Sequence, residues 1–369
     1  MASQEQATST ENATTTELTV VSNAPDTTSF DNLFPLPAKT ANVLPPLKTS
    51  SKTASVPTVR KTPIVVSTPP VVSSPSTKAP VTTTIPVASA PAPSTGIAGS
   101  VVNILCTPHT SAIAGSSGSG VIIDSRGIIL TVAHVAEYEL LEEALGSSVM
   151  SCVVRTGSPA RTAYTARVVY LPQPWIQENG TGIISSRQIG TGENDFALLA
   201  ITGSATGKPL PSSFPALPLA SSGSSLGDTI NFAGYGGQGL TDAQIQNALT
   251  ATLVQGKIED IFSITGGHSS DGLTISAGSA SQSGASGGAI ATTDKQLAGI
   301  FIGSFTSDSG VREGLATTAS YIRRAFAASM GESLDSYIAA KSPSALVASY
   351  TPQAVTLGRL LARSIGLSQ

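Results

Sequence analysis

A succession of short β-type runs, separated by turn residues, constrains the fold of this chain most strongly. The first group of runs lies between Val101 and Ile201, and the second group lies between Thr229 and Ile302. Gly, Ser and Asp stand between successive runs, and a Pro/Ser-rich segment, 208–218, separates the two groups. Many short strands with regularly spaced turn signals are typical of β-sandwiches and β-barrels. We therefore expect an all-β domain made of two units of similar size.

The first 96 residues have a different composition, dominated by Thr, Ser, Pro, Ala and Val. Segments such as Ser67–Pro70 and Ala90–Pro93 recur without helical or strand periodicity. Such a composition cannot bury enough apolar surface to offset the entropy lost when the chain is ordered. Residues 1–96 are therefore predicted to form a disordered, partly polyproline-like linker. Two interpretations are open: a stalk that holds the folded domain away from a surface, and a tail without a specific role.

After Thr317 the periodicity becomes helical. The segments Ser320–Ala328 and Ser333–Lys341 carry apolar residues three and four positions apart, which predicts two short helices. Thr351 followed by Pro352 is typical of a helix N-terminus, so a third helix is predicted to begin there. Its short, weakly basic sequence favours a helix docked on the domain, and a helix lying on a membrane surface is the second interpretation.

Composition and charge exclude several classes of partner. Charged residues make up 12% of the chain, and its formal net charge is -3. Because no run of Lys and Arg is present, nucleic acid is not expected as a partner. No apolar run is long enough to cross a bilayer, so no transmembrane segment is predicted. The N-terminus lacks the pattern of a signal peptide, although the Pro/Thr-rich linker favours a location in the cell envelope or outside the cell. The sequence sets no oligomeric state.

The chain has two cysteines, Cys106 and Cys152. They are too few for a disulfide framework or for a zinc site made of cysteines. One disulfide between them and two small buried apolar side chains are both compatible with the sequence. His, Cys and Asp residues do not show the spacing of metal ligands, so neither a metal nor another cofactor is expected.

Three segments carry the residue types of one kind of chemistry. His134 directly follows an apolar run, Asp195 directly precedes one, and Ser286 lies in a Gly-Ala-Ser-Gly-Gly stretch. A serine hydroxyl is a poor nucleophile until a neighbouring imidazole removes its proton. A carboxylate behind the imidazole fixes its tautomer and stabilises the imidazolium that forms. The three residues are therefore candidates for nucleophilic acyl transfer.

The glycines around Ser286 meet a second requirement of acyl transfer. The tetrahedral intermediate needs hydrogen-bond donors aimed at its oxyanion. Glycine permits unusual φ values and close approach, so that backbone N–H groups can converge on one point. The N–H groups of Gly284 and Ser286 are the predicted donors of this oxyanion hole.

The motifs, in the order His, Asp and Ser, resemble those of the trypsin-like (chymotrypsin-fold) serine peptidases. The stretch Gly118–Val135 is most similar to the HtrA-like bacterial branch of that family. The resemblance covers about residues 98–328. It implies an all-β fold of two packed six-stranded antiparallel β-barrels, with the catalytic residues in the cleft between them.

The resemblance also implies how the chain is divided. A peptidase domain would occupy residues 97–328, with a first barrel at about 97–205 and a second barrel at about 218–318. Residues 329–369 would then form a C-terminal helical extension. This extension is too short for a PDZ domain, so regulation and trimer assembly of the HtrA kind are not expected.

The resemblance assigns a role to each candidate residue. It implies that His134 is the general base, that Asp195 orients it, and that Ser286 is the nucleophile. The segment Ile302-Gly303-Ser304 matches the strand on which the family binds its substrate, which implies that it pairs with the peptide by β-augmentation.

Two positions depart from the pattern of the vertebrate digestive members. Ala285 stands where those enzymes carry an Asp that pairs with a newly cut N-terminus, so activation by that cut is not expected here. Ala280, six positions before the nucleophile, would lie at the base of the specificity pocket. Because it is not acidic, cleavage after Lys or Arg is disfavoured, and a preference for small or medium apolar side chains is expected.

These expectations describe a serine endopeptidase that hydrolyses polypeptide substrates through an acyl-enzyme. Two alternatives are open at this point. The domain could bind peptide strands without cleaving them, or its one substrate could be its own N-terminal linker.

Overall fold

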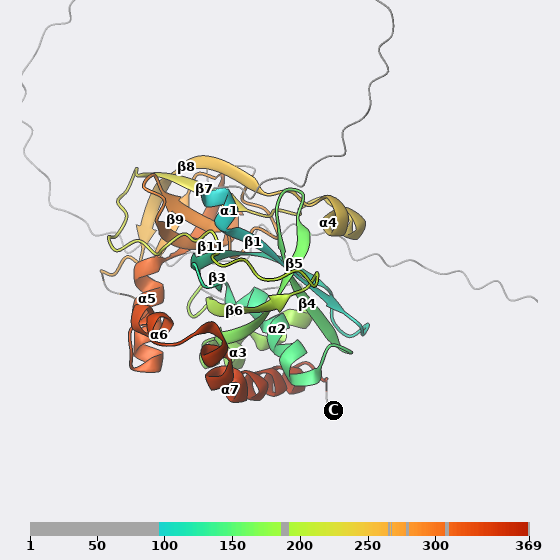
Figure 1. The fold of residues 1–369 in the computed structure, drawn as a ribbon. Helices are drawn as coiled ribbons and strands as arrows, with labels where there is room; N and C mark the ends of the chain where they lie inside the picture. Colours follow the sequence, from blue (N-terminus) through green and yellow to red (C-terminus); the bar gives the residue numbers. More distant parts are fainter. Residues whose placement is uncertain are drawn as a thin grey trace, which may run out of the picture.

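The computed structural model describes residues 96–185, 192–264, 266, 268–277, 280–306 and 310–367. Apart from Gly96, the predicted linker of residues 1–96 lies outside the described residues. The described chain contains two closed antiparallel β-barrels (Figure 1). Each barrel has six strands in the described residues, which confirms the predicted fold class.

The first barrel comes from the first group of predicted runs. Its strands are β1 (Val101–Pro108), β2 (Ser116–Asp124), β3 (Ile128–Thr131), β4 (Met150–Thr156), β5 (Arg161–Tyr170) and β6 (Ala197–Ser204). They pair in the order β1-β2-β3-β6-β5-β4, and β4 pairs with β1 to close the barrel. Cys106 on β1 lies opposite Cys152 on β4, and the two form a disulfide. The disulfide, one of the two alternatives left open by the sequence, therefore joins the strands that close this barrel.

The second barrel contains one strand more than the predicted runs supply. Its strands are β7 (Thr229–Gly234), β8 (Thr252–Phe262), β9 (Gly272–Ile275), β10 (Ala289–Thr292), β11 (Leu297–Thr306) and β12 (Arg312–Thr318). They pair in the order β10-β11-β12-β9-β8-β7. β12 lies beyond the last predicted run, and Leu315 is its one large apolar side chain. Pairing with both β9 and β11 holds it in strand form, which local sequence alone does not indicate.

Helices pack on the outside of the barrels, and the C-terminal part of the described chain is helical. They are α1 (Ile97–Ser100), α2 (Ala133–Leu145), α3 (Gln173–Asn179), the 3₁₀ helix η1 (Gly180–Ile184), α4 (Asp242–Ala248), α5 (Ala319–Met330), α6 (Leu334–Ala340) and α7 (Pro343–Ser364). The two short C-terminal helices predicted by periodicity are present as α5 and α6. Figure 1 shows α7 beside α2 and α3, and α7 also packs on β5 of the first barrel.

The prediction that a helix begins at Thr351 and Pro352 is wrong, because α7 runs through both residues. Its N-cap is Ser342, whose side chain accepts a backbone N–H, and Pro343 occupies the first turn. An internal proline removes one helix hydrogen bond. Apolar residues on both sides of Pro352 are nevertheless buried, so packing outweighs this local cost.

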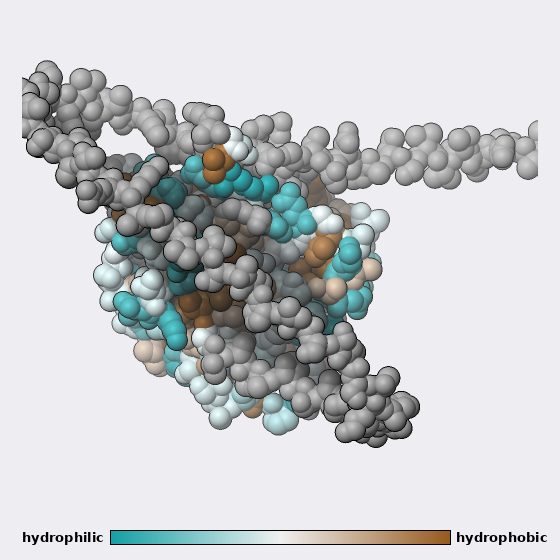
Figure 2. Space-filling model, turned by 90° about the horizontal axis from the view of Figure 1, so that it is seen from above, coloured by the Kyte–Doolittle hydropathy of each residue, from teal (hydrophilic) through white to brown (hydrophobic). Residues whose placement is uncertain are grey.

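The packing of α7 fixes the C-terminal extension to the domain. The Tyr350 hydroxyl donates to the carbonyl of Leu171 at 2.8 Å and accepts the N–H of the same residue at 2.9 Å. Among the described residues, no helix combines the length and apolarity that crossing a membrane requires. Where the face shown in Figure 2 is not covered, hydrophobic and hydrophilic residues lie side by side.

A buried arginine joins the two barrels. Arg155 on β4 is 2% exposed, and its Nε donates to Oδ1 of Asn103 at 2.7 Å. Its Nη atoms donate to the carbonyl oxygens of Ile245 at 3.0 Å and Gln246 at 2.9 Å. These carbonyls lie in the last turn of α4, where a helix has unsatisfied acceptors and partial negative charge. Arg155 therefore holds α4, from the β7–β8 connection of the second barrel, against the first barrel.

We expect Arg155→Met to lower the free energy of unfolding by about 2–4 kcal/mol, because the α4 carbonyls and Asn103 lose their donor in a partly buried site. Urea denaturation followed by fluorescence measures this change. Arg161→Met is the matched control, since Arg161 also donates to α4, at the Asn247 carbonyl, but from an exposed position. Its effect should stay within about 0.5 kcal/mol. Equal effects of the two variants would contradict a special role of the buried guanidinium.

Candidate active site

His134 and Asp195 form a buried hydrogen-bonded pair. His134 is the second residue of α2, just after β3, and Asp195 lies just before β6. Because β3 and β6 pair antiparallel, the end of one strand meets the start of the other. His134 Nδ1 lies 2.8 Å from Asp195 Oδ2, and the backbone N–H of His134 donates to Oδ1 at 3.1 Å. Exposure is 6% for His134 and 2% for Asp195.

The N-terminus of α2 also stabilises the negative charge of the Asp195 carboxylate. The first N–H groups of a helix have no partner within the helix, and the helix dipole favours negative charge there. The Asp195 carboxylate accepts one of these N–H groups and also contacts the imidazole of the same residue. Two contacts to one residue hold the ring in a single orientation, with Nδ1 toward Asp195 and Nε2 on the side away from it.

A tight turn presents Asp195 to the histidine. Asn194 adopts a left-handed conformation with φ 59°, which asparagine tolerates better than most residues. Its N–H donates to the hydroxyl of Tyr321 at 3.0 Å. Tyr321 belongs to α5, so a C-terminal helix supports the turn that carries Asp195.

The loop around Ser286 needs glycine at defined positions. Gly284 and Gly287 have φ values of 88° and 86°. A Cβ atom at Gly287 would lie 2.0 Å from the carbonyl oxygen of Ser119, so no other residue fits there without a shift of backbone. Within the described chain, the N–H groups of Gly284 and Ser286 donate to no protein acceptor. Both donors are therefore available to a ligand, as an oxyanion hole requires.

Ser119 connects this loop to the first barrel. It lies on β2 and is fully buried. Its N–H donates to the carbonyl of Ser286 at 2.7 Å, and its Oγ donates to the carbonyl of Gly284 at 3.0 Å. The same Oγ accepts the N–H of Tyr235 at 2.9 Å. No role was predicted for Ser119 from the sequence, although its position between two glycines on the strand-type run before His134 was an available signal.

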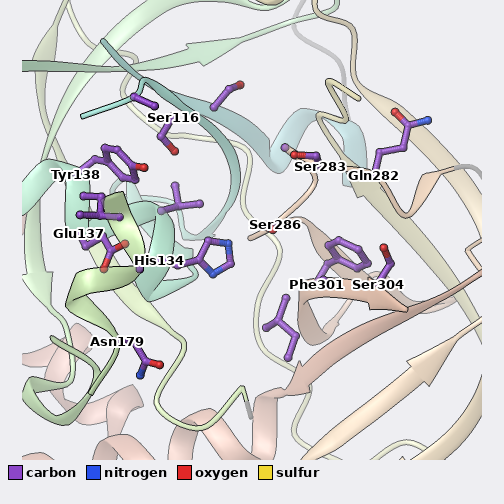
Figure 3. A pocket seen from close by; sticks show the side chains of 18 of the residues that line it. Ser116, His134, Glu137, Tyr138, Asn179, Gln282, Ser283, Ser286, Phe301 and Ser304 are labelled. Atoms are coloured by element: carbon purple, nitrogen blue, oxygen red, sulfur yellow. The ribbon is translucent and has the colours of Figure 1, made fainter. Parts of the chain in front are cut away.

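A cavity of about 290 Å³ lies between residues of the two barrels. Figure 3 shows His134 beside Ser286, with first-barrel residues such as Glu137 on one side and Phe301 and Ser304 on the other. The predicted residues that line this cavity are His134, Gly284, Ser286, Ile302, Gly303 and Ser304. Asp195 lies behind His134 rather than in the lining.

Ala280 is placed apart from this lining. It is 4% exposed and belongs to the apolar core of the second barrel. A role at the base of a specificity pocket stays a prediction.

The segment Ile302-Gly303-Ser304 has an open edge. β10 begins at Ala289, which pairs with Ile300, so the later residues of β11 extend beyond β10. Among the described strands, only β12 pairs with this part of β11, and the register shifts at Ile302. Such an edge offers backbone N–H and C=O groups to an added strand.

Two further residues of the site, Glu137 and Trp175, were missed by the sequence analysis. Both line the cavity, and Trp175 Nε1 donates to Glu137 Oε2 at 3.2 Å. The Trp175 and His134 ring centroids are 6.4 Å apart. Burial raises the pKa of Glu137 well above its usual range; the Trp175 hydrogen bond opposes this rise, and the charge of Asp195 adds to it. The helical spacing of Glu137, three residues after His134, was a usable signal.

We expect stability to depend on the ionisation of Glu137. Between the usual carboxyl pKa and the raised one, the folded protein holds a proton that the unfolded chain releases. The free energy of unfolding therefore falls as pH rises through this range, by up to about 1.4 kcal/mol per pH unit. Glu137→Gln keeps an acceptor for Trp175 and removes the ionisation, so its stability relative to wild type should increase as pH rises above the usual carboxyl pKa. Urea unfolding at several pH values measures the difference.

The exposed residue Glu178 on α3 provides the control for this measurement. Glu178→Gln should follow the wild-type pH dependence. If the curves for Glu137→Gln and wild type run parallel across the whole range, the buried carboxyl is not the source of the pH dependence.

The two barrels, with His134 and Ser286 in the cleft between them, have the architecture of the trypsin-like peptidases. Residues 118–300 match the family model for the trypsin-like peptidase domain, and the chain therefore contains such a domain. The match concerns trypsin-like peptidases in general and does not single out the HtrA-like branch.

Solved structures with a similar fold include those of the Rv3671c protease from M. tuberculosis. Its active form is 21% identical, with 64% of this chain and 83% of that chain covered and a TM-score of 0.39. An inactive form is 20% identical, with 63% and 89% covered and a TM-score of 0.37. No curated protein matches the sequence. At such low identity no residue role is carried over from that protein to this chain.

Proposed function

We propose that this protein is a serine endopeptidase that cleaves polypeptides through an acyl-enzyme. The observation that carries the proposal is the His134 imidazole, which is hydrogen-bonded to buried Asp195 on one side and lines the same cavity as Ser286. A ring held in this way can remove a proton from a hydroxyl and return it to a leaving group.

In the proposed mechanism, His134 takes the proton of Ser286 as Ser286 Oγ attacks the carbonyl carbon of the scissile bond. Asp195 stabilises the imidazolium that forms without becoming protonated. The N–H groups of Gly284 and Ser286 bind the oxyanion of the tetrahedral intermediate. His134 then gives its proton to the leaving amine, and water hydrolyses the acyl-enzyme by the same steps.

The peptide is proposed to bind along the open edge of β11. Its backbone would add a strand to Ile302-Gly303-Ser304, which brings the scissile carbonyl to Ser286. Backbone pairing supplies affinity without dependence on side chains. Specificity must then come from the walls of the cleft.

A fluorophosphonate probe tests the nucleophile. We expect it to label the wild-type protein at Ser286, because the probe reacts with serines activated by a neighbouring base. Ser286→Ala should abolish the labelling and the cleavage of casein. Mass spectrometry of the labelled peptide identifies the site. A wild-type protein that is folded but neither labelled nor active would support the alternative of a peptide-binding module without catalysis.

The carboxylate has its own test. Asp195→Asn should lower the turnover number by roughly a thousand- to ten-thousandfold, because an amide favours the wrong histidine tautomer. Asp294→Asn, at an exposed position outside the cleft, is the matched control and should not change turnover. A similar small effect of both substitutions would refute the triad.

A further inference from the structure

One side of the cleft is formed by the segment that connects β5 to β6. This segment contains α3 and η1, and we call its residues Gln173–Ile184 the α3–η1 wall. The residues of this wall that line the cavity are Trp175, Asn179, Gly182 and Ile183. Figure 3 shows Asn179 on the same side of the cavity as His134, and Ser304 on the opposite side. The α3–η1 wall therefore faces the segment proposed to pair with the substrate.

Short helical elements such as these do not hold their position by themselves. The helix α3 has seven residues, η1 has five, and neither has a side-chain hydrogen bond at its N-cap. Isolated helices of this length are not stable in water, so packing against other elements decides where they lie. The position of the α3–η1 wall therefore depends on its neighbours.

The C-terminal helix α7 is one of these neighbours, and it contacts the wall at two points. The hydroxyl of buried Tyr350 bonds to both backbone groups of Leu171, just before the N-cap of α3. At the start of η1, a Cβ atom at Gly180 would lie 3.0 Å from Cδ1 of fully buried Leu361. Because α7 supplies no residue to the cavity lining, it supports the wall from outside.

The same helix also packs closely on α2. A Cβ atom at Gly358 of α7 would lie 2.3 Å from the Leu140 carbonyl oxygen and 2.6 Å from Ala144 Cβ. Such a close approach of two helices requires glycine at this position. Leu140 and Ala144 lie in the second half of α2, whereas His134 lies in its first turn. The contact therefore anchors α7 to the first barrel at a distance from the catalytic base.

The position of His134 has supports of its own. Asp195 binds both its ring and its backbone N–H, and the pairing of β3 with β6 brings the two residues together. Neither contact involves α7. A change in α7 should therefore affect the α3–η1 wall more than the His134–Asp195 pair.

We propose that α7 positions the α3–η1 wall for the binding of polypeptide substrates, with Tyr350 as the positioning residue. This proposal rests on the proposed peptidase function and gives the C-terminal helix a part in it. A peptide bound between Ser304 and Asn179 contacts the wall, whereas acyl transfer itself needs the triad and the oxyanion donors. Loss of the Tyr350 contact should therefore weaken substrate binding and spare the chemical step.

The variant Tyr350→Phe tests this role, because it removes the hydroxyl and keeps the ring. We expect its KM for fluorescently labelled casein to rise roughly three- to tenfold, the range that one or two buried hydrogen bonds supply. Its kcat should stay within about twofold of wild type. A small fluorophosphonate should label Ser286 at the wild-type rate, because a small probe needs the catalytic residues but not the wall.

The matched control is Tyr337→Phe on α6. Tyr337 is also buried in the C-terminal extension, and its hydroxyl donates to the carbonyl of Val169 at 2.8 Å. Val169 lies within β5, which the barrel pairing holds in place. This variant should lose stability to urea much as Tyr350→Phe does, but keep the wild-type KM. Leu361→Ala removes the second contact with the wall and should raise KM in the same direction as Tyr350→Phe.

The outcomes separate this proposal from the peptidase function. If Tyr350→Phe and Tyr337→Phe have the same KM, α7 only stabilises the fold and its positioning role is wrong. If Tyr350→Phe slows fluorophosphonate labelling as much as casein cleavage, α7 acts on the catalytic residues and not on the wall. The peptidase function stands in both cases. If wild type is neither labelled nor active on casein, the proposed function itself is wrong.

Discussion

The contact between Ser119 and the loop of Ser286 is the interaction on which the candidate site depends. It joins β2 of the first barrel to a loop of the second barrel through the carbonyls of Ser286 and Gly284. With these carbonyls held on the Ser119 side, the N–H groups of Gly284 and Ser286 are left without protein acceptors. A site whose halves come from two barrels needs such a link, because small displacements cost much in acyl transfer.

The histidine half of the site uses a helix terminus for the same purpose. The Asp195 carboxylate accepts a backbone N–H at the start of α2 and also contacts the His134 ring. One side chain therefore caps the helix and orients the imidazole. Arg155 acts in a similar way at the opposite end of a helix, where it binds the last carbonyls of α4. In both cases a charged side chain from one element satisfies backbone groups of another element. Arg155 does so across the two barrels, and Asp195 does so within the first barrel.

The cleft between the barrels is chemically asymmetric. Its first-barrel side carries Glu137, whose carboxyl is bound to Trp175, and its second-barrel side carries Arg312. The side chains that line it come from segments far apart in the sequence. Ala280, chosen by its distance from Ser286 along the chain, lies in the apolar core of the second barrel.

Local sequence determined much of this protein by itself. Short strand-type runs between turn signals predicted an all-β domain of two units, because strand burial repeats within a few residues, and the family resemblance implied that the units are six-stranded barrels. His134, Asp195 and Ser286 were singled out because each stands at a strand boundary in a recognisable order, and their catalytic roles stay a proposal. The tertiary structure alone decided three features that depend on distant segments: the Cys106–Cys152 pair, the strand form of β12, and the continuation of α7 through Pro352. The same holds for the Ser119 link, because it depends on a packing partner that no local pattern specifies.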